Sequence, residues 1–462
     1  MSHVKTVDAY RLLILRRDAT EILLSPQDAG WTLPRVEIQK QQRIAEQLTN
    51  EIRKAWDLET FCLLLPSCGA SGPSAGAAIA ILECVKRNQK APPRTHWMPV
   101  HVAADCTSAE DASTIRDALA ELASYASGEK FGPFAKPGWL RELFQWTYEQ
   151  TAPLGLRLTG NFRQHNASPT FSLLRLETDG PAIWFKAAGE PNAHELPVTL
   201  LLADRFPSHV PRILGVHPSW NGWLSEEVAG RPLDELTECS AWERAAEGLA
   251  ELQIESIGRA AELVDGKCKD LRLPLAARHI DRFVTRMGAF MRVQEKQSPA
   301  PLVGTELLSL GEGLKDAFSL LQSFEFPDTL GHLDCNPGNL IVSPERCVFL
   351  DWAEACVTNP VITFEYLRRH MERCGIEEPA ADSRITATYL RPWASFFSPD
   401  DLRRAIAAVP PVAVFIHAIA GDAWRTLDPV SNPALAAYFR SLTRRMYRDT
   451  VLAAERSERC LN

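Results

Sequence analysis

One short stretch of the sequence contains side chains of the kinds that support phosphoryl transfer. Residues Gly331–Ala355 read GHLDCNPGNLIVSPERCVFLDWAEA and include His332, Asp334, Asn339 and Asp351. Phosphoryl transfer needs a carboxylate to receive the proton of an acceptor hydroxyl, and oxygen ligands for the metal ion on the phosphates. Asp334 and Asn339 lie five positions apart, which is the spacing of the aspartate and asparagine on a kinase catalytic loop.

Two apolar runs, LIV and CVFL, flank the polar segment SPER and predict a β-hairpin. Pairing of the two strands would carry Asp351 back beside Asn339. Asp334 is then the predicted catalytic residue, facing the acceptor, and Asn339 and Asp351 are the predicted magnesium ligands. The competing interpretation is that these residues only cap turns in a polar loop, which Asp and Asn often do.

The same loop carries a resemblance to a known family. HLDCNPGNLIV…VFLDWAEA resembles the loop of the aminoglycoside phosphotransferase and choline kinase-like family, whose usual form is close to HGDxHPGN followed by IDW or LDW. Leu333 replaces a common glycine and Asn336 a common histidine, so the loop is expected to pack differently. The resemblance extends from about Leu156 to the C-terminal helices. The matching positions are His332, Asp334, Pro337, Gly338, Asn339, Asp351 and Trp352, with Asn359–Pro360 further on.

The resemblance implies a protein-kinase-like, two-lobed α+β fold that transfers phosphate from ATP, with Mg²⁺, to a hydroxyl of a small molecule. Lys186, at the end of the apolar run AIWFK, would bind the α- and β-phosphates, and Glu195 would be its carboxylate partner. Pro197 fits only the first turn of a helix. Glu195 therefore lies at a helix start, where it could instead interact with the helix dipole.

Three further residues are candidates for nucleotide binding. Ser168 lies between two predicted strands, where the family has its phosphate loop, but glycine is scarce there and a plain hairpin turn is the alternative. Glu227 and Val228 precede the first helix of the predicted large lobe, where relatives have the interlobe linker and the adenine contacts. Those contacts are usually made by the backbone.

The first third of the chain has another pattern. Its order of strand, strand, WTLP, helix and strand is similar to a Nudix domain, whose helix carries carboxylates for a metal ion. With LPRV aligned on the usual LPGG, Glu51 matches, but Lys54 and Ala55 replace the paired glutamates, which leaves too few carboxylates for a divalent ion. The resemblance implies an inactive Nudix-like domain. The alternative is an unrelated α/β domain with an amphipathic helix.

These patterns predict four segments. They are a degenerate Nudix-like domain over 1–130, a linker helix within 131–155, a small β-rich lobe over 156–230 and a large helical lobe over 231–455. A Gly/Ser-rich segment at 68–76 lacks the Lys-Ser/Thr of a P-loop and is predicted to be a loop. His417, inside the apolar run AVFIHAIAG, is predicted to be a core histidine rather than a ligand.

Composition narrows the class of protein. The chain has 462 residues, 45% hydrophobic and 23% charged, as expected for a soluble globular protein of more than one domain. A net charge of −8 without a basic run argues against nucleic-acid and anionic-membrane partners. The apolar stretch 405–421 contains two adjacent prolines and is predicted to be a buried helix. Eleven cysteines without C-x-x-C spacing favour reduced thiols and a cytoplasmic location.

The leading functional hypothesis is an ATP- and Mg²⁺-dependent small-molecule kinase. A second hypothesis is a nucleotide-binding regulator with a kinase-like fold and weak catalysis, which the glycine-poor phosphate loop favours and the Asp334, Asn339 and Asp351 set disfavours. A third, a Nudix-type hydrolase, conflicts with the missing glutamates. Neither the acceptor nor the oligomeric state follows from the sequence.

Overall fold

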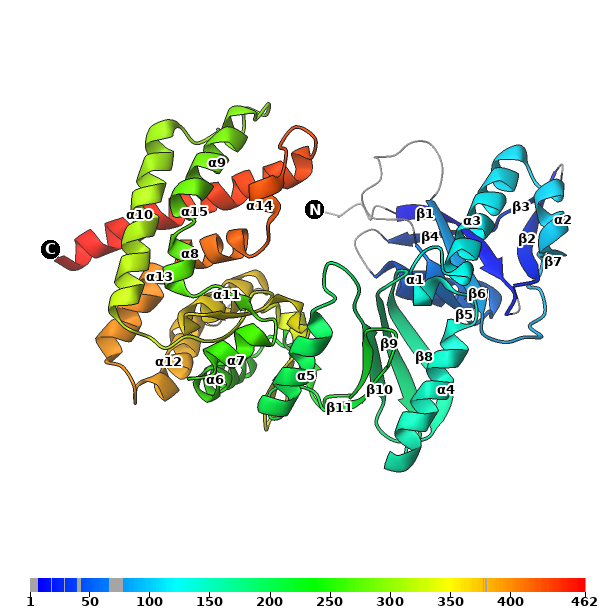
Figure 1. Cartoon of the computed structure of the whole chain (residues 1–462), viewed down its shortest axis with the longest axis horizontal. Helices are drawn as coiled ribbons and strands as arrows, with labels where there is room; N and C mark the ends of the chain where they lie inside the picture. Colours follow the sequence, from blue (N-terminus) through cyan, green and yellow to red (C-terminus); the bar gives the residue numbers. More distant parts are fainter. Residues whose placement is uncertain are drawn as a thin grey trace. The chain divides into compact units, whose positions relative to one another are not determined.

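The computed structural model describes residues 7–17, 19–28, 30–39, 43–65, 78–376, 378 and 380–461 (Figure 1). The Gly/Ser-rich segment 68–76 lies outside these ranges. The chain divides into two compact units. The first unit is Met1–Leu196 with Arg212–Glu227, and the second is Pro197–Pro211 with Val228–Asn462.

The first unit begins with a mixed seven-stranded sheet in the order β3-β2-β1-β6-β5, with β4 paired to β1 and β7 to β2. Strands β1 and β6 run parallel. Its strands are β1 (Val7–Leu15), β2 (Glu21–Gln27), β3 (Gly30–Thr32), β4 (Arg35–Gln39), β5 (Thr60–Leu64), β6 (Ala78–Cys84) and β7 (His96–Pro99). Its helices are α1 (Ile44–Trp56), α2 (Val100–Ala103), α3 (Ala109–Ser127) and α4 (Trp139–Thr151).

The continuous apolar run of β1 arises because both faces of this sheet are buried. Successive side chains of a strand point to opposite faces. Leu12 and Ile14 accordingly join one core cluster, with Leu48 and Ile52 of α1. The intervening residues Leu13 and Leu15 join a second cluster, together with side chains of α3 and α4.

The same unit contains a second, five-stranded antiparallel sheet in the order β11-β12-β10-β9-β8. Its strands are β8 (Leu158–Ala167), β9 (Ser172–Thr178), β10 (Ile183–Ala187), β11 (Ile213–Val216) and β12 (Gly222–Glu226). Helix α5 (Glu195–Arg205) begins at the end of the first unit and continues in the second. These elements match the strands and the helix expected of the small lobe.

The two sheets of the first unit share a core. An aromatic chain runs from Phe61 of β5 through Trp139 and Phe134 to Phe185 of β10, with ring centroids 5.0–5.9 Å apart. The buried amide of Gln164 on β8 also accepts a hydrogen bond from the backbone N–H of Cys62 (2.7 Å) and donates one to its carbonyl (3.1 Å). Because an isolated 1–130 fragment would expose this core, the first domain is best studied in the full chain.

The second unit is mostly helical. Its helices are α6 (Cys239–Glu255), α7 (Ala260–Asp265), α8 (Leu273–Ala277), α9 (Ile280–Arg292), α10 (Gly304–Ser323), α11 (Pro360–Arg373), α12 (Ala381–Trp393), α13 (Pro399–Ile419), α14 (Ala423–Thr426) and α15 (Pro433–Leu461). Two small sheets, β13-β16-β17 and β14-β18-β15, lie among them. Their strands are β13 (Arg231–Pro232), β14 (Lys269–Asp270), β15 (Thr329–His332), β16 (Leu340–Val342), β17 (Cys347–Phe349) and β18 (Ala355–Thr358).

Local sequence signals explain the elements that hold the loop at 331–355. Strands β16 and β17 pair antiparallel around the SPER turn, where Ser343 N–H donates to the carbonyl of Arg346 (2.9 Å). Helix α11 begins after Asn359, whose side chain accepts a hydrogen bond from Val361 N–H, with Pro360 at its first position. The predicted hairpin is therefore confirmed, and a capped helix follows it directly.

One helix among the described residues, α13, is long and apolar enough to cross a membrane. Its most apolar stretch is 72% buried inside the protein, as in the core helix of a soluble domain, so the prediction of a buried helix is confirmed. Nine cysteines in the described part of the chain are free, and seven of these nine are buried.

Candidate functional site

The candidate site is a loop in the second unit that joins β15 to the β16–β17 hairpin. Asn339 Nδ2 donates hydrogen bonds to the carboxylate of Asp334 (3.1 Å) and to its carbonyl (3.2 Å). The loop is tightened by Asn336, whose side chain accepts from Gly338 N–H (3.1 Å). The five-residue spacing thus closes a turn that holds the amide and the carboxylate side by side.

The hairpin brings Asp351 to the same end of the loop. Leu350 N–H donates to the carbonyl of Asn339 (2.8 Å), so Asp351 follows directly after a residue that is hydrogen-bonded to Asn339. Asp351 adopts the left-handed conformation, with φ 63° and ψ 66°. A non-glycine residue there is uncommon and is often found at functional sites. The geometry is that expected from the sequence.

His332 holds the loop in place through two hydrogen bonds. It is buried, and its Nε2 donates to the carbonyl of Leu350 (2.9 Å), while its backbone N–H donates to Thr363 Oγ1 of α11 (3.1 Å). Burial lowers the pKa of His332. This effect outweighs those of the hydrogen bond to Leu350 and of the neighbouring carboxylates, which raise the pKa. The imidazole is therefore neutral and fixes the residue that precedes Asp351.

This burial predicts a pH-dependent contribution of His332 to stability. Its pKa is lowered in the folded protein but is about 6.5 in the unfolded chain. The unfolded state therefore binds more protons below that value, and stability falls as the pH falls. His332→Gln keeps an N–H donor for Leu350 but cannot titrate. Between about pH 7.5 and about pH 5.5, chemical unfolding should show a larger loss of stability for the wild type than for the variant. Equal losses would contradict this role.

The charges around Asp334 suit a proton acceptor. Partial burial raises the pKa of the Asp334 carboxyl, and the nearby carboxylates of Asp351 and Glu354 raise it further, whereas His332 and the hydrogen bond from Asn339 lower it. Even so, Asp334 remains solvent-exposed. A carboxylate that is accessible and slightly more basic than usual can receive a hydroxyl proton.

The residues present fit a magnesium ion. Because the Asn339 amide N–H₂ is turned to Asp334, its Oδ1 is left for another ligand, and Asp351 supplies a carboxylate beside it. Among the described residues, no group of three or more His, Cys, Asp or Glu side chains could hold a metal ion. Magnesium does not require one, since it usually binds one or two protein oxygens together with phosphates and water.

In the first unit, Lys186 and Glu195 form the predicted ion pair. Lys186 Nζ lies 2.5 Å from Glu195 Oε1, and the side chains are 13% and 3% exposed. Lys186 is on β10, and its ammonium also lies over the ring of Trp223 on β12 (5.9 Å). Glu195 is the first residue of α5, as the position of Pro197 predicted. Its carboxylate also pairs with the ammonium group of Lys186.

Two of the other three candidates, Ser168 and Glu227, make local hydrogen bonds. Ser168 Oγ accepts a hydrogen bond from Phe171 N–H (2.9 Å) and so caps the turn between β8 and β9. The Glu227 carboxylate binds the Arg175 guanidinium through two hydrogen bonds (2.6 and 3.0 Å). The division between the two units falls between Glu227 and Val228. Nucleotide binding by Ser168, Glu227 and Val228 stays a prediction.

The carboxylates of Glu46 and Glu51 on α1 each lie near a basic side chain. Glu46 lies 3.1 Å from His165 Nδ1 on β8, and Glu51 faces Lys54 at 3.8 Å on the exposed side of the helix. A pocket of about 400 Å³ in the described part of this unit is lined by other residues, among them Arg17 and Arg141. These contacts agree with an inactive metal site, while the Nudix resemblance itself stays a prediction.

The full chain should accordingly show no metal-dependent hydrolysis of nucleoside diphosphate compounds at the first domain. Assays with Mg²⁺ and with Mn²⁺ on the Asp334→Asn variant would exclude a contribution from the second unit. Hydrolysis in that variant that disappears when Glu51→Gln is added would contradict the prediction, because Glu51 is the one carboxylate that matches the Nudix pattern.

His417 is not the core histidine that the sequence predicted. It lies on the exposed side of α13, and its Nε2 is hydrogen-bonded to the hydroxyl of Tyr438 on α15 (2.7 Å). Sequence reasoning also missed the ion pair between Lys269 and Glu354, which lies beside the loop because Leu333 N–H donates to the carbonyl of Glu354 (3.1 Å). For the exposed position of His417, the available signal in the sequence was a polar residue on one helical face of an apolar run.

Comparison with known families agrees with the resemblance seen in the loop at 331–355. Residues 191–394 match the model of the phosphotransferase enzyme family (APH). No match to a curated protein was found. A solved macrolide 2'-phosphotransferase, MphH from Brachybacterium faecium, is 17% identical, with a TM-score of 0.44, covering 64% of this chain and 97% of that one. A choline/ethanolamine kinase family protein from Mesorhizobium loti is 16% identical, with a TM-score of 0.44, covering 67% and 93%.

Structural similarities this low do not indicate a substrate. The match of the family model is specific to the segment that contains Asp334, Asn339 and Asp351, in the loop whose residues resemble the family pattern. Over residues 191–394, the chain is similar to the phosphotransferase enzyme family.

Proposed function

We propose that the protein transfers the γ-phosphoryl group of ATP to a hydroxyl of a small molecule, with Mg²⁺. The observation that carries the proposal is the hydrogen-bonded pair of Asp334 and Asn339, with Asp351 placed beside Asn339 by the hairpin. This arrangement supplies the proton acceptor and the oxygen ligands that phosphoryl transfer needs. The family match supports a phosphotransferase.

In the proposed reaction, the acceptor hydroxyl oxygen forms a bond to the γ-phosphorus while the bond from that phosphorus to the bridging oxygen of ADP breaks. The hydroxyl proton passes to Asp334. Asn339 and Asp351 would hold Mg²⁺, which neutralises charge on the phosphates when it is bound. Lys186, oriented by Glu195, would bind the inner phosphates.

The alternative proposal is a nucleotide-binding regulator with little turnover. Release of ADP from ATP and Mg²⁺ in the presence of a panel of hydroxyl compounds separates the two, with the phosphorylated product identified by mass spectrometry. Product formation that requires Asp334 supports the kinase. ATP binding without any product across the panel would support the regulator. We place the protein in the cytoplasm, where ATP is abundant and the free thiols stay reduced.

A further inference from the structure

A pocket in the first unit has a position and a charge that the proposed function does not use. Its volume of about 400 Å³ lies within the range of small-molecule sites in proteins. All of its described lining residues belong to the first unit, and none belongs to α1, so the pocket is separate from the carboxylates that the Nudix resemblance concerns. Among the lining residues are Arg17, Phe61, Glu83, Val85, Arg141 and Phe144.

The pocket lies at the carboxyl ends of two parallel strands. Strands β1 and β6 run parallel, with Leu15 opposite Glu83, and they end at Leu15 and Cys84. Arg17 follows the end of β1 by two positions, and Val85 follows β6 directly. In open α/β sheets, ligands commonly bind in the hollow outside the carboxyl ends of the parallel strands. The topology of this sheet therefore places the pocket where such sheets bind ligands.

Alternation along β1 directs Arg17 to the side of the sheet that α4 covers. Leu13 and Leu15 pack on that side, in the core cluster that contains side chains of α4, and Arg17 comes two positions later. The preceding residue, Arg16, has its guanidinium over the ring of Trp97 (5.2 Å), which belongs to the core on the other side of the sheet. Of these two consecutive arginines, Arg17 is therefore the one that lines the pocket.

The start of helix α4 forms another wall of the pocket. The buried carboxylate of Glu83 accepts a hydrogen bond from the N–H of Gly138 (2.7 Å), the residue before the helix. Its negative charge thus stabilises the N-terminus of α4. Gly138 has φ 89°, and a Cβ added to it would meet Arg141 Nη2 at 2.7 Å. The lack of a side chain at Gly138 therefore lets the Arg141 guanidinium lie against the start of the helix.

The two arginines of the pocket have no acidic partner in the described part of the chain. Within that part, no ion pair or side-chain hydrogen bond joins Arg17 or Arg141 to another residue. Glu142 follows Arg141 in sequence, but consecutive residues of a helix do not face each other. An arginine always carries its charge in proteins. The pocket therefore holds two positive charges that lack a carboxylate among the described residues.

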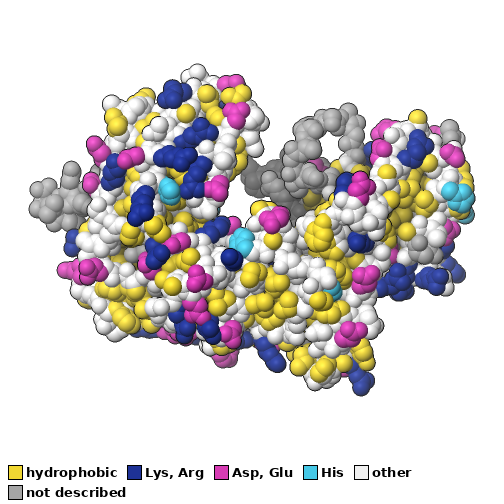
Figure 2. All heavy atoms as spheres, in the orientation of Figure 1, with side chains coloured by type: hydrophobic (Ala, Val, Ile, Leu, Met, Phe, Trp, Pro, Cys, Tyr) yellow, Lys and Arg dark blue, Asp and Glu magenta, His cyan; other side chains and the backbone are white. Residues whose placement is uncertain are grey.

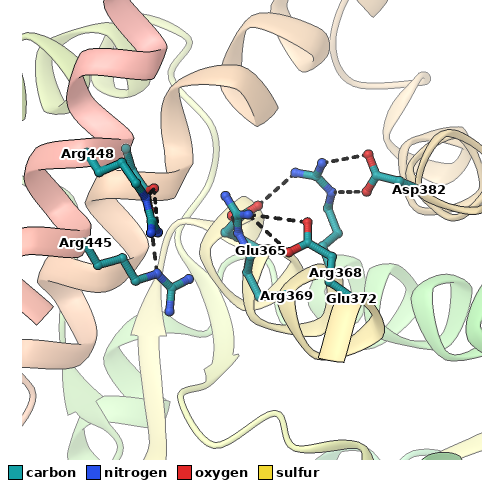
Figure 3. A network of polar contacts seen from close by, with 8 residues as sticks. Glu365, Arg368, Arg369, Glu372, Asp382, Arg445 and Arg448 are labelled. Atoms are coloured by element: carbon teal, nitrogen blue, oxygen red, sulfur yellow. Dashed lines mark hydrogen bonds and ion pairs between the residues drawn. The ribbon is translucent and has the colours of Figure 1, made fainter. Parts of the chain in front are cut away.

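Paired arginines of the same chain show the contrast. On the face of the molecule seen in Figure 2, Lys and Arg side chains lie among Asp and Glu side chains. Within the second unit, Figure 3 shows Arg368 and Arg369 bound to the carboxylate of the buried Glu365 (2.8 and 2.7 Å). Since no such carboxylate binds Arg17 or Arg141 among the described residues, their N–H donors can bind an anion from solution. Carboxylate and phosphate fit a guanidinium well, because they accept two parallel hydrogen bonds.

Apolar side chains form much of the remaining wall. Phe61 of β5 is held edge-on against Trp139 (ring centroids 5.8 Å apart), and Phe144 of α4 is held edge-on against Phe162 of β8 (6.1 Å). Val85 lies on the same side of the sheet. A ligand that fills this pocket therefore needs an apolar part to lie against these side chains, in addition to an anionic group for the arginines.

We propose that this pocket binds a small molecule with a carboxylate or phosphate group and an apolar part. Arg17 and Arg141 hold the anionic group, and the apolar part lies against Phe61 and Phe144. The first unit thereby has a binding role of its own. This role does not require phosphoryl transfer by the second unit, so the proposed function and the ligand of this pocket can be tested separately.

Calorimetry on the full chain with probes that share one ring and differ in charge tests this proposal. Phenyl phosphate and benzoate are anionic, benzyl alcohol is neutral and benzylamine is cationic. We expect saturable binding of an anionic probe, and no binding of the neutral and cationic probes. Inorganic phosphate should bind more weakly than phenyl phosphate, because it lacks the apolar part. Tighter binding of phenyl phosphate than of benzoate would identify a phosphate ligand, and the reverse a carboxylate ligand.

Substitution of the two arginines locates the binding. Arg17→Gln and Arg141→Gln should each raise the Kd of the bound anion roughly 10- to 100-fold, as for a lost charge-assisted hydrogen bond. Arg141→Lys keeps the charge and should restore part of the affinity. Arg141 is exposed, so its variants should melt within a few degrees of the wild type.

Arg116→Gln is the matched control. Arg116 is exposed on α3 of the same unit and does not line the pocket. Its substitution removes the same charge from a helix of the same unit, so the Kd of the anion should stay near the wild-type value.

Three outcomes would overturn the proposal. The first is that neither anionic probe shows saturable binding to the full chain. The second is that the neutral or the cationic probe binds as tightly as the anions. The third is that an anion binds, but with the same Kd in Arg17→Gln and Arg141→Gln as in Arg116→Gln, which would place the anion outside this pocket.

Discussion

Replacing Asp334 with asparagine is expected to lower kcat at least about a hundredfold while the affinity for ATP stays nearly unchanged, because a general base or orienting carboxylate contributes roughly 10²–10⁴ to the rate. Asparagine has the same shape, and its carbonyl can still accept the hydrogen bond that Asn339 Nδ2 donates to Asp334. The loop should therefore keep its conformation. Steady-state kinetics with the accepted hydroxyl compound would measure the loss.

Two measurements separate a chemical effect of this substitution from a structural one. The melting temperature of Asp334→Asn should equal that of the wild type within a few degrees, since an exposed, isosteric change rarely costs more than about 0.5 kcal/mol. ATP binding, measured by calorimetry with Mg²⁺, should also be preserved. Wild-type turnover in this variant would show that Asp334 is not the proton acceptor.

Replacing Asp351 with asparagine should weaken the binding of ATP in the presence of Mg²⁺ at least about tenfold, because a charged metal ligand becomes neutral. Asparagine is preferable to alanine here. Asp351 has φ 63°, and asparagine tolerates this left-handed conformation, whereas alanine adds backbone strain. A difference between the two variants in melting temperature would therefore report strain, and a common loss of Mg·ATP binding would report the ligand.

Glu345→Gln provides a control for charge in the same hairpin. Glu345 lies in the turn at the other end of β16 and β17, where its carboxylate accepts from Ser343 Oγ (2.9 Å). Its substitution removes one negative charge without touching Asn339 or Asp351. Thermal stabilisation by Mg·ATP should persist in Glu345→Gln and be lost in Asp351→Asn. Full stabilisation of Asp351→Asn by Mg·ATP would refute the assignment of Asp351 as a metal ligand.

The candidate site was predictable because most of it is local. Asp334, Asn339 and Asp351 lie within one hairpin and its preceding loop, so turn chemistry and strand pairing alone bring them together. The pair of Lys186 and Glu195 is also close in sequence, at the end of one strand and the start of the next helix. Resemblance to the family added the roles of the loop residues, and it was also the source of the predicted pairing of Lys186 with Glu195.

What the tertiary structure decided depends on contacts between segments far apart in the chain. The continuous apolar run of β1 indicates two buried faces, but not that a second sheet shares the core of one of them through Phe185. An apolar run around His417 favours burial by composition, yet the packing of α13 against α15 turns this one side chain outward to Tyr438. Periodicity fixes which face of a helix is apolar, whereas the neighbour that covers each face, and thus which polar side chains meet, is set by the packing of the whole domain.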